Sequence, residues 1–151
     1  MKNTTLCYIE YNGCYLMLHR TSKKNDENHD KWIGVGGKFE NGESPYDCVR
    51  REIEEETGYK NLPLEYRGIV TFVSNEYGTE YMHLFTAKAP NDKIYKSCNE
   101  GELVWVEKES VKELPIWEGD KIFFKLLDEE HDFFSLKLCY EGEKLTSYFK
   151  E

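Results

Sequence analysis

The sequence predicts one mixed α/β domain, in which strands rich in β-forming residues alternate with two amphipathic helices. The chain has 151 residues, a length typical of one domain, and we place a single domain at 1–151. Hydrophobic residues make up 39% of the chain and aromatic residues 15%, which is enough for a packed core and excludes a disordered polyelectrolyte. The longest apolar run, Cys14–Leu18, has five residues, far fewer than the about 20 that a membrane-spanning helix needs.

The charge balance restricts the class of partner. With 29 acidic and 20 basic residues the net charge is −9, which disfavours binding to DNA or RNA polymers. A small anionic ligand is compatible with this charge if a metal ion lies between it and the protein. The five cysteines are odd in number and lack Cys-x-x-Cys spacing, so we expect reduced thiols in a cytoplasmic protein. We expect neither a secretory leader nor membrane attachment.

The first elements are predicted to be a hairpin followed by a loop. Asn12-Gly13 separates the β-like runs Thr5–Glu10 and Cys14–His19, and Asn-Gly between two such runs favours a tight hairpin turn. Thr21–Asp30 is polar and charged, as is typical of a loop. Trp32–Lys38 contains three glycines, which predicts a strand end that leads into a tight turn with exposed backbone.

The clearest predicted helix follows. Ser44 suits the N-cap, Pro45 the first helical position and Asp47 the acidic partner of a capping box. Gly58 is a natural helix end. An apolar stripe at i, i+3, i+4 spacing supports this helix: Tyr46, Val49 and Ile53.

The second half of the chain predicts further strands around a second helix. The expected strands are Glu65–Ser74, Glu80–Ala89, Leu103–Val106, Phe133–Tyr140 and Lys144–Lys150. The last two are predicted to form a terminal hairpin around Glu141-Gly142. Gly119–Glu130 carries apolar residues at helical spacing and predicts the second amphipathic helix.

Three glutamates on the first helix form the strongest chemical signal. Glu52, Glu55 and Glu56 fall within a sector of about 100° on a helical wheel, beside the apolar stripe. Carboxylates at i, i+3 and i+4 repel one another, and a divalent cation that prefers oxygen ligands relieves that repulsion. Arg51 is placed to hold Glu55. The competing interpretation is an ordinary solvated acidic face.

Neighbouring residues favour the metal interpretation. Gly36-Gly37 allows a ligand or metal to approach the main chain closely, and Glu43 precedes the helix. Together with these residues, the stretch Gly37–Tyr59 resembles the box motif of the Nudix family. Gly37, Glu43, Arg51-Glu52, Glu55-Glu56 and Gly58 stand at that motif's spacing, and Tyr59 replaces its usual aliphatic last residue. The strand and helix order is similar to the Nudix α/β/α sandwich, with a mixed central sheet, two main helices and a C-terminal hairpin.

The resemblance implies an enzyme that hydrolyses a diphosphate linked to another group, with Mg²⁺ or Mn²⁺ as cofactor. It implies metal ligation by three carboxylates and one carbonyl, those of Glu52, Glu55, Glu56 and Gly37. It makes either Glu52 or Glu56 the general base. Arg51 is expected to orient the carboxylates, and Glu43 to support the loop or an outer-shell metal.

Outside the box the chain resembles the MutT branch of this family, especially the mammalian type of 8-oxo-dGTP diphosphatase. That resemblance implies a further metal ligand, Glu100. It also implies a base pocket formed by Lys23, Ile33, Gly36, Lys38, Phe72, Trp117 and Asp120, in which Trp117 stacks on the base and Asp120 bonds its Watson–Crick edge.

Several alternatives stay open. Trp117 and Phe72 also suit core positions, Asp120 suits an N-cap, and Lys23 suits a solvated loop. The relative's base-reading asparagine is Ile33 here, and the first of its two aspartates is Gly119. The expected function is therefore hydrolysis of nucleoside triphosphates, with oxidised purine deoxynucleotides such as 8-oxo-dGTP favoured, in nucleotide-pool sanitation and so DNA repair. ADP-ribose, a dinucleoside polyphosphate or an undamaged dNTP are the alternative substrates, and a non-catalytic nucleotide sensor is the alternative class. Both a monomer and a homodimer are compatible with the sequence.

Overall fold

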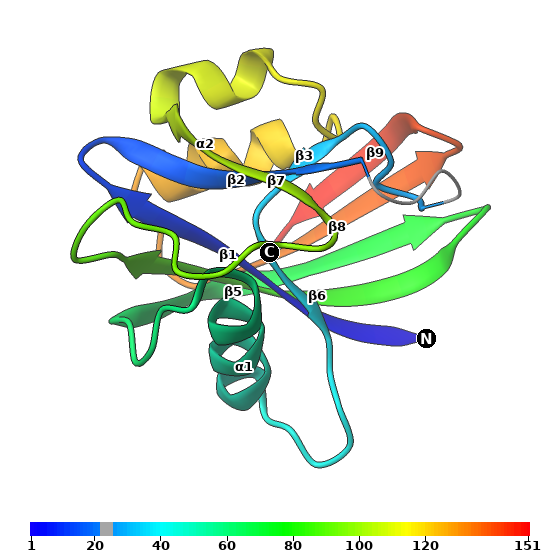
Figure 1. Cartoon of the computed structure of the whole chain (residues 1–151). Coiled ribbons are helices and arrows are strands. Elements are labelled where there is room, and N and C mark those ends of the chain that lie inside the picture. The colour runs from blue at the N-terminus through cyan, green and yellow to red at the C-terminus, as the bar shows by residue number, and fades with distance from the viewer. Residues whose placement is uncertain (22–25) are drawn as a thin grey trace.

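The computed structural model describes residues 1–21 and 26–151, and these residues form a nine-stranded mixed sheet with helices on both faces (Figure 1). The strands are β1 (Lys2–Tyr11), β2 (Cys14–Arg20), β3 (Trp32–Ile33), β4 (Val35–Lys38), β5 (Leu64–Ser74), β6 (Gly78–Lys88), β7 (Gly101–Glu107), β8 (Phe134–Glu141) and β9 (Lys144–Lys150). The helices are α1 (Pro45–Thr57), the 3₁₀ helix η1 (Lys108–Glu113) and α2 (Asp120–Asp128). The predicted fold class, two main helices and terminal hairpin are confirmed.

Strand β1 organises the sheet. It pairs in parallel with β6 along its length, and on its other edge it pairs antiparallel with β4 at one end and with β2 at the hairpin end. Strand β2 also pairs with β3 and β7, whereas β5 joins β6 to the β8–β9 hairpin. The sheet is therefore mixed.

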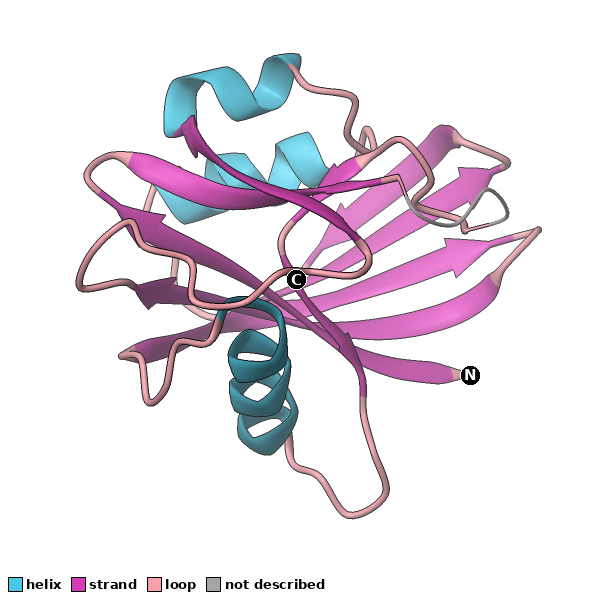
Figure 2. Ribbon diagram, in the orientation of Figure 1, coloured by secondary structure: helices cyan, strands magenta, loops and turns pink. Residues whose placement is uncertain are grey.

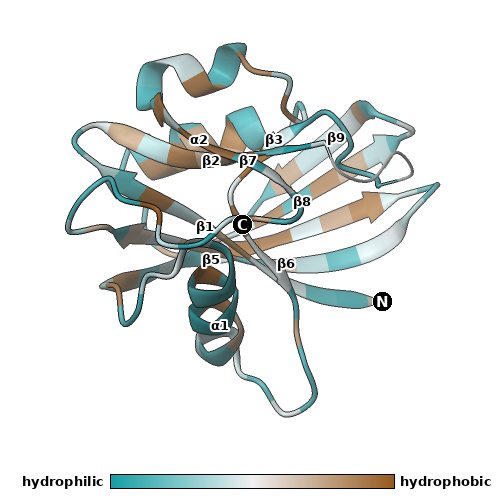
Figure 3. Ribbon diagram, viewed as in Figure 1, coloured by the Kyte–Doolittle hydropathy of each residue, from teal (hydrophilic) through white to brown (hydrophobic). Residues whose placement is uncertain are grey.

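The two faces of β1 supply two separate cores. Leu6 and Tyr8 pack in the cluster that includes α2, whereas Cys7 and Ile9 pack in the cluster that includes α1. Successive side chains of β1 thus point to opposite faces of the sheet, and both faces are buried. Figure 2 shows α1 on one side of the strands and α2 and η1 on the other, and Figure 3 shows that hydrophobic residues concentrate on the strands between them.

The ends of α1 are set by local chemistry. The Ser44 hydroxyl accepts a hydrogen bond from the Asp47 amide at 3.0 Å, and the Asp47 carboxylate accepts one from the Ser44 amide at 3.0 Å. This is the predicted capping box. Gly58 ends the helix with a φ of +84°, and a Cβ there would lie 2.6 Å from the Cβ of Tyr95. Both the left-handed backbone and the close neighbour require glycine.

The structure differs from the sequence prediction in four local features. Gly36 and Gly37 lie inside β4, paired with β1, and not in a tight exposed turn. Tyr46 is 37% exposed, although its predicted stripe neighbours Val49 and Ile53 are buried. Helix α2 begins at Asp120 and ends at Asp128, so it is shorter than predicted, and η1 was not predicted because six residues carry too little periodicity. Within the described residues, no helix is long and apolar enough to cross a membrane.

The capping box makes a stability prediction. Replacing Ser44 with Ala removes the hydroxyl that accepts the hydrogen bond from the Asp47 amide, and with it one of the two bonds of the capping box. We therefore expect the free energy of unfolding to fall by about 1 kcal/mol. Ser44→Asp keeps an acceptor and should stay within a few tenths of a kcal/mol of the wild type. Urea unfolding followed by tryptophan fluorescence measures both, and equal stability of all three proteins would contradict the cap.

Candidate active site

One face of α1 lies against the glycines of β4. The Gly36 amide donates to Glu56 Oε2 at 3.1 Å, and Glu56 is only 6% exposed. A Cβ at Gly37 would lie 2.5 Å from Glu52 Oε1, so the Glu52 carboxylate occupies the space that a side chain would need. The Gly37 carbonyl accepts a weak hydrogen bond from the Cys48 thiol at 3.6 Å. Glycine at both positions therefore allows the carboxylates to reach the main chain.

Arg51 forms hydrogen bonds with the carboxylates of Glu43, Glu52 and Glu55. Its Nε and Nη2 donate to the two oxygens of Glu43 at 2.7 and 2.9 Å, which is a bidentate pair. Its Nη1 donates to Glu52 at 2.8 Å and to Glu55 at 3.2 Å, and its Nη2 reaches the Lys38 carbonyl at 3.0 Å. The hydrogen bond with Arg51 lowers the pKa of Glu43 to about 2. Arg51 also lies 3.4 Å from Glu40, so it contacts four glutamates, and its orienting role stays a prediction.

Among the described residues, Glu56 takes part in no ion pair, and it lies beside Glu100. Burial, together with the carboxylates of Glu100 and Glu52, raises the pKa of Glu56 to about 9, although the Gly36 amide lowers it. Burial also raises the pKa of Glu52, against the effect of Arg51. Oxygens of Glu56 and Glu100 and the Cys98 sulfur lie within 4.8 Å of one another. The donor set is crowded, negatively charged when ionised and rich in oxygen, which fits a divalent cation.

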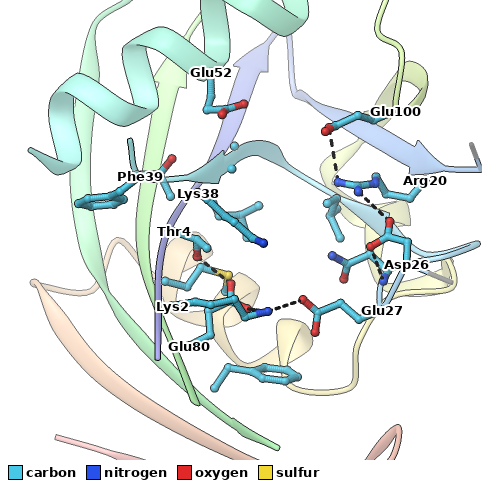
Figure 4. Close-up of a pocket in the computed structure, with 18 of the residues that line it drawn as sticks. Lys2, Thr4, Arg20, Asp26, Glu27, Lys38, Phe39, Glu52, Glu80 and Glu100 are labelled. Atoms are coloured by element: carbon cyan, nitrogen blue, oxygen red, sulfur yellow. Dashed lines mark hydrogen bonds and ion pairs between the residues drawn. The ribbon is translucent and has the colours of Figure 1, made fainter. Parts of the chain in front are cut away.

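A pocket of about 970 Å³ opens beside these carboxylates (Figure 4). Glu52, Arg51 and Glu100 line it at one end, and Trp117 and Asp120 line it elsewhere. Of the predicted binding residues, those on the pocket wall are Ile33, Gly36, Gly37, Lys38, Phe72, Trp117 and Asp120. Its size lies within the range of small-ligand sites.

Trp117 belongs to both the core and the pocket. It is 5% exposed and meets Phe72 and Tyr140 edge to face, at ring distances of 5.4 and 5.1 Å. Its indole nitrogen donates to Asn28 Oδ1 at 2.8 Å, and the Lys31 ammonium lies 4.8 Å from its ring. Trp117 therefore belongs to the core and also lines the pocket, so the core position and the pocket position are compatible.

Asp120 is a buried acid in the pocket wall. It is 6% exposed, and burial raises its pKa to about 8, although Lys31 lowers it. The N-cap of α2 is Gly119, without a side-chain capping bond, so the alternative of Asp120 as a cap is wrong. A Cβ at Gly119 would lie 2.5 Å from Leu138, which explains glycine at this position.

The remaining predicted residues lie in different environments. The Glu55 side chain is 56% exposed and lies outside the pocket wall, although it shares a helical sector with Glu52 and Glu56. Lys23 lies outside the described residues.

The sequence interpretation missed the polar pocket residues Lys2, Thr4, Arg20, Asp26, Glu27 and Glu80, labelled in Figure 4. Of these residues, Arg20 could have been recognised as a candidate site residue from the sequence, because it is a charged residue directly after the predicted strand Cys14–His19.

The missed polar residues form two ion-paired groups. Arg20 contacts Asp26 at 2.7 Å and Glu100 at 3.4 Å. Lys2 contacts Glu27 at 3.0 Å and Glu80 at 3.6 Å. Thus charges from β1, β2 and β6 meet the loop that follows β2 around the pocket.

Comparison with known proteins agrees with the geometry. A family model described as the NUDIX domain matches residues 3–127. The chain is 28% identical over 124 residues to an uncharacterized Nudix hydrolase, YvcI, of Bacillus subtilis, covering 80% of this chain and 75% of the relative. It is 29% identical over 133 residues to the oxidized purine nucleoside triphosphate hydrolase of Mus musculus, covering 83% and 81%. The crystal structure of a MutT protein from Bacillus halodurans is 29% identical and superposes with a TM-score of 0.85, covering 100% of this chain and 98% of the other.

The buried Asp120 makes a pH prediction. The folded chain keeps the Asp120 proton up to about pH 8, whereas the unfolded chain loses it near its ordinary pKa of 3.8. Between these values the unfolded state binds fewer protons, so this group makes stability fall as pH rises. We expect the stability of wild type relative to Asp120→Asn to drop by at least about 1 kcal/mol from pH 5 to pH 8, since one pKa unit corresponds to about 1.4 kcal/mol. Urea unfolding at several pH values measures this, and parallel curves would overturn it.

Proposed function

The chain belongs to the Nudix hydrolase family, and from this premise we propose that it is a metal-dependent pyrophosphohydrolase of nucleoside triphosphates. The proposed products are the nucleoside monophosphate and pyrophosphate. Oxidised purine deoxynucleotides such as 8-oxo-dGTP are the proposed substrates, and sanitation of the cytoplasmic nucleotide pool, which protects DNA, is the proposed role.

One observation carries this proposal, namely that a single pocket joins the carboxylates of Glu52 on α1 and of Glu100 to an aromatic wall. Glu52 and Glu100 line the same cavity as Phe72, Trp117 and Asp120. A nucleoside triphosphate has both features that such a pocket serves, an anionic chain at one end and a flat base at the other. The net charge of −9 and the carboxylates at this end of the pocket favour a cation between the protein and an anionic substrate.

The residues of the site fit the divalent cation that the family implies. Burial, together with the carboxylates of Glu100 and Glu52, raises the pKa of Glu56 to about 9, and none of the ion pairs of the described residues includes Glu56, which favours an added cation there. We propose ligation by the side chains of Glu52, Glu55, Glu56 and Glu100 and by the Gly37 carbonyl, with Mg²⁺ as the cation and Mn²⁺ as a substitute. When bound, this cation neutralises charge on the phosphate oxygens.

The chain's own residues have distinct proposed roles. Between the two candidate general bases, Glu52 is favoured over Glu56, because Glu52 lines the pocket and Glu56 is buried beside Gly36. Arg51 orients Glu52, and Glu43 fixes Arg51 through its bidentate contact. Lys38 is a proposed phosphate ligand because Figure 4 shows it reaching into the pocket.

The base end supports a purine with polar edges. Phe72 and Trp117 offer aromatic surface, and the Asp120 carboxyl, which is protonated below about pH 8, offers both a donor and an acceptor. The mouse relative is named for oxidized purine nucleoside triphosphates, and the Bacillus halodurans structure is described as a MutT protein. Gly36, Ile33 and Lys23 complete the proposed substrate-binding set.

The residues at positions 33 and 119 favour a second class of substrate. Ile33 presents an apolar side chain to the pocket, and Gly119 has no room for a larger residue. Fewer hydrogen bonds to the base mean weaker discrimination between bases. ADP-ribose, a dinucleoside polyphosphate or an undamaged dNTP is therefore the alternative substrate.

The substrate proposal is tested by comparing 8-oxo-dGTP with dGTP at equal low concentration and saturating Mg²⁺. We expect at least about tenfold faster formation of the oxidised monophosphate, because the base-specific contacts involve buried polar groups. Chromatography of the products measures both rates. Equal rates would favour the alternative substrates, and tight binding without any product would favour the non-catalytic sensor.

The site proposal is tested with three neighbouring glutamates of α1. Glu55→Gln and Glu56→Gln are each expected to lower turnover by at least about a hundredfold, because each removes a proposed metal ligand. Glu54→Gln is the matched control, because Glu54 contacts only Lys60, at 3.8 Å, among the ion pairs of the described residues, and it should retain turnover. Circular dichroism checks the fold, and the stabilisation of the protein by Mg²⁺ should be lost in Glu56→Gln. Full turnover by a folded Glu56→Gln protein would refute the metal assignment.

A further inference from the structure

We propose that Cys98 gives the carboxylate cluster a sulfur ligand, so that Glu56, Cys98 and Glu100 bind a thiophilic divalent cation such as Zn²⁺. This inference concerns the same site as the proposed function and rests on it only for the consequence that zinc competes with Mg²⁺. The binding itself depends on the geometry of three side chains and not on any nucleotide.

The three ligand atoms converge from two separate parts of the chain. Glu56 comes from the last turn of α1, whereas Cys98 and Glu100 precede and adjoin β7. All three ligand atoms lie within 4.8 Å of one another. A tetrahedral zinc ion with bonds of about 2.0 Å to oxygen and 2.3 Å to sulfur separates its ligands by roughly 3.3–3.5 Å. Small side-chain rotations are therefore enough to close the set around one ion.

The Glu56 carboxylate faces the Cys98 thiol. The Gly36 amide holds Glu56 Oε2 at 3.1 Å, and the other oxygen, Oε1, is the one that faces Cys98 Sγ at 4.0 Å. The buried carboxylate thus presents to the sulfur the oxygen that the Gly36 amide does not hold. The main-chain amides of Glu100 and Gly101 lie against the same sulfur. Amides around a sulfur are a suitable environment for a metal thiolate.

The cluster is accessible to an ion. Glu56 is buried, but the Glu100 side chain is 38% exposed and Cys98 is partly exposed, so an ion has a path from solvent. Arg20 contacts Glu100 at 3.4 Å, but its contact with Asp26 is closer, at 2.7 Å. Arg20 therefore keeps a carboxylate partner when Glu100 turns to a metal.

The sulfur changes which cation the site favours. Mg²⁺ takes oxygen ligands and gains nothing from a thiol, whereas Zn²⁺ and Co²⁺ accept thiolate together with carboxylate. Glu56 and Glu100 belong to the proposed Mg²⁺ ligand set as well, so one ion excludes the other. Zinc at this cluster therefore acts as an inhibitor of the Mg²⁺-dependent reaction.

Cobalt provides a direct readout, because a Co²⁺–thiolate bond absorbs in the near ultraviolet by charge transfer. Metal-free protein, kept reduced, is titrated with Co²⁺ without nucleotide. We expect a charge-transfer band that saturates near one equivalent and is removed by equimolar Zn²⁺ but persists in about a hundredfold excess of Mg²⁺. Cys98→Ser should lose the band and bind Co²⁺ at least about tenfold more weakly.

The control cysteine is Cys139, which is partly exposed on β8 and lies outside the pocket wall. Cys139→Ser should keep the full band. If Cys98→Ser does not fold, alkylation of the wild type with iodoacetamide gives the same information. Zn²⁺ should protect Cys98 and leave Cys139 reactive, as measured by mass spectrometry of peptides.

The two proposals fail in different ways. A wild-type protein without a charge-transfer band, or a band that survives in Cys98→Ser, overturns the sulfur ligand and leaves the Mg²⁺ enzyme intact. A band that depends on Cys98 in a protein that hydrolyses no nucleotide supports the sulfur ligand and overturns the proposed function.

Discussion

Crowding of negative charge on one side of α1 is the constraint on which the site depends. Carboxylates one helical turn apart destabilise a helix unless a positive group lies between them. Arg51 meets this need for Glu43, Glu52 and Glu55 at distances of 2.7 to 3.2 Å. Glu100 has a cation of its own, Arg20, at 3.4 Å, whereas none of the ion pairs of the described residues includes Glu56. Burial, together with the carboxylates of Glu100 and Glu52, raises the pKa of Glu56 to about 9. The negative charge of the cluster is therefore least balanced at Glu56.

The sheet makes this crowding possible through the glycines of β4. A Cβ at Gly36 would lie 2.0 Å from the Thr5 carbonyl, and one at Gly37 would meet Glu52 at 2.5 Å. A side chain at Gly36 would separate β4 from β1, and one at Gly37 would displace the Glu52 carboxylate. The capping box at Ser44 then fixes where α1 begins, and so fixes which turn of the helix faces the glycines. A local backbone requirement thus determines where the charges lie.

Local signals made much of this predictable from sequence. The helix ends depended on Ser44, Asp47 and Gly58, which act on their immediate neighbours, and the carboxylate spacing predicted a cluster. The burial of each carboxylate was not predictable from the sequence. Glu55 and Glu56 share one sector of the helical wheel, and Glu56 is buried only because it packs against β4. The contacts of Cys98 with Glu56 and of Arg20 with Glu100 join residues 42 and 80 positions apart, and no local pattern encodes them.

The same long-range contacts connect the two ends of the pocket. Glu100 contacts Arg20, Arg20 contacts Asp26, and the Asp26 carboxylate accepts a hydrogen bond from the Asn28 amide at 3.3 Å. The Asn28 side chain in turn accepts the bond from the indole of Trp117. A continuous series of polar contacts therefore runs from Glu100 at the carboxylate end, through the loop residues Asp26 and Asn28, to Trp117 in the aromatic wall.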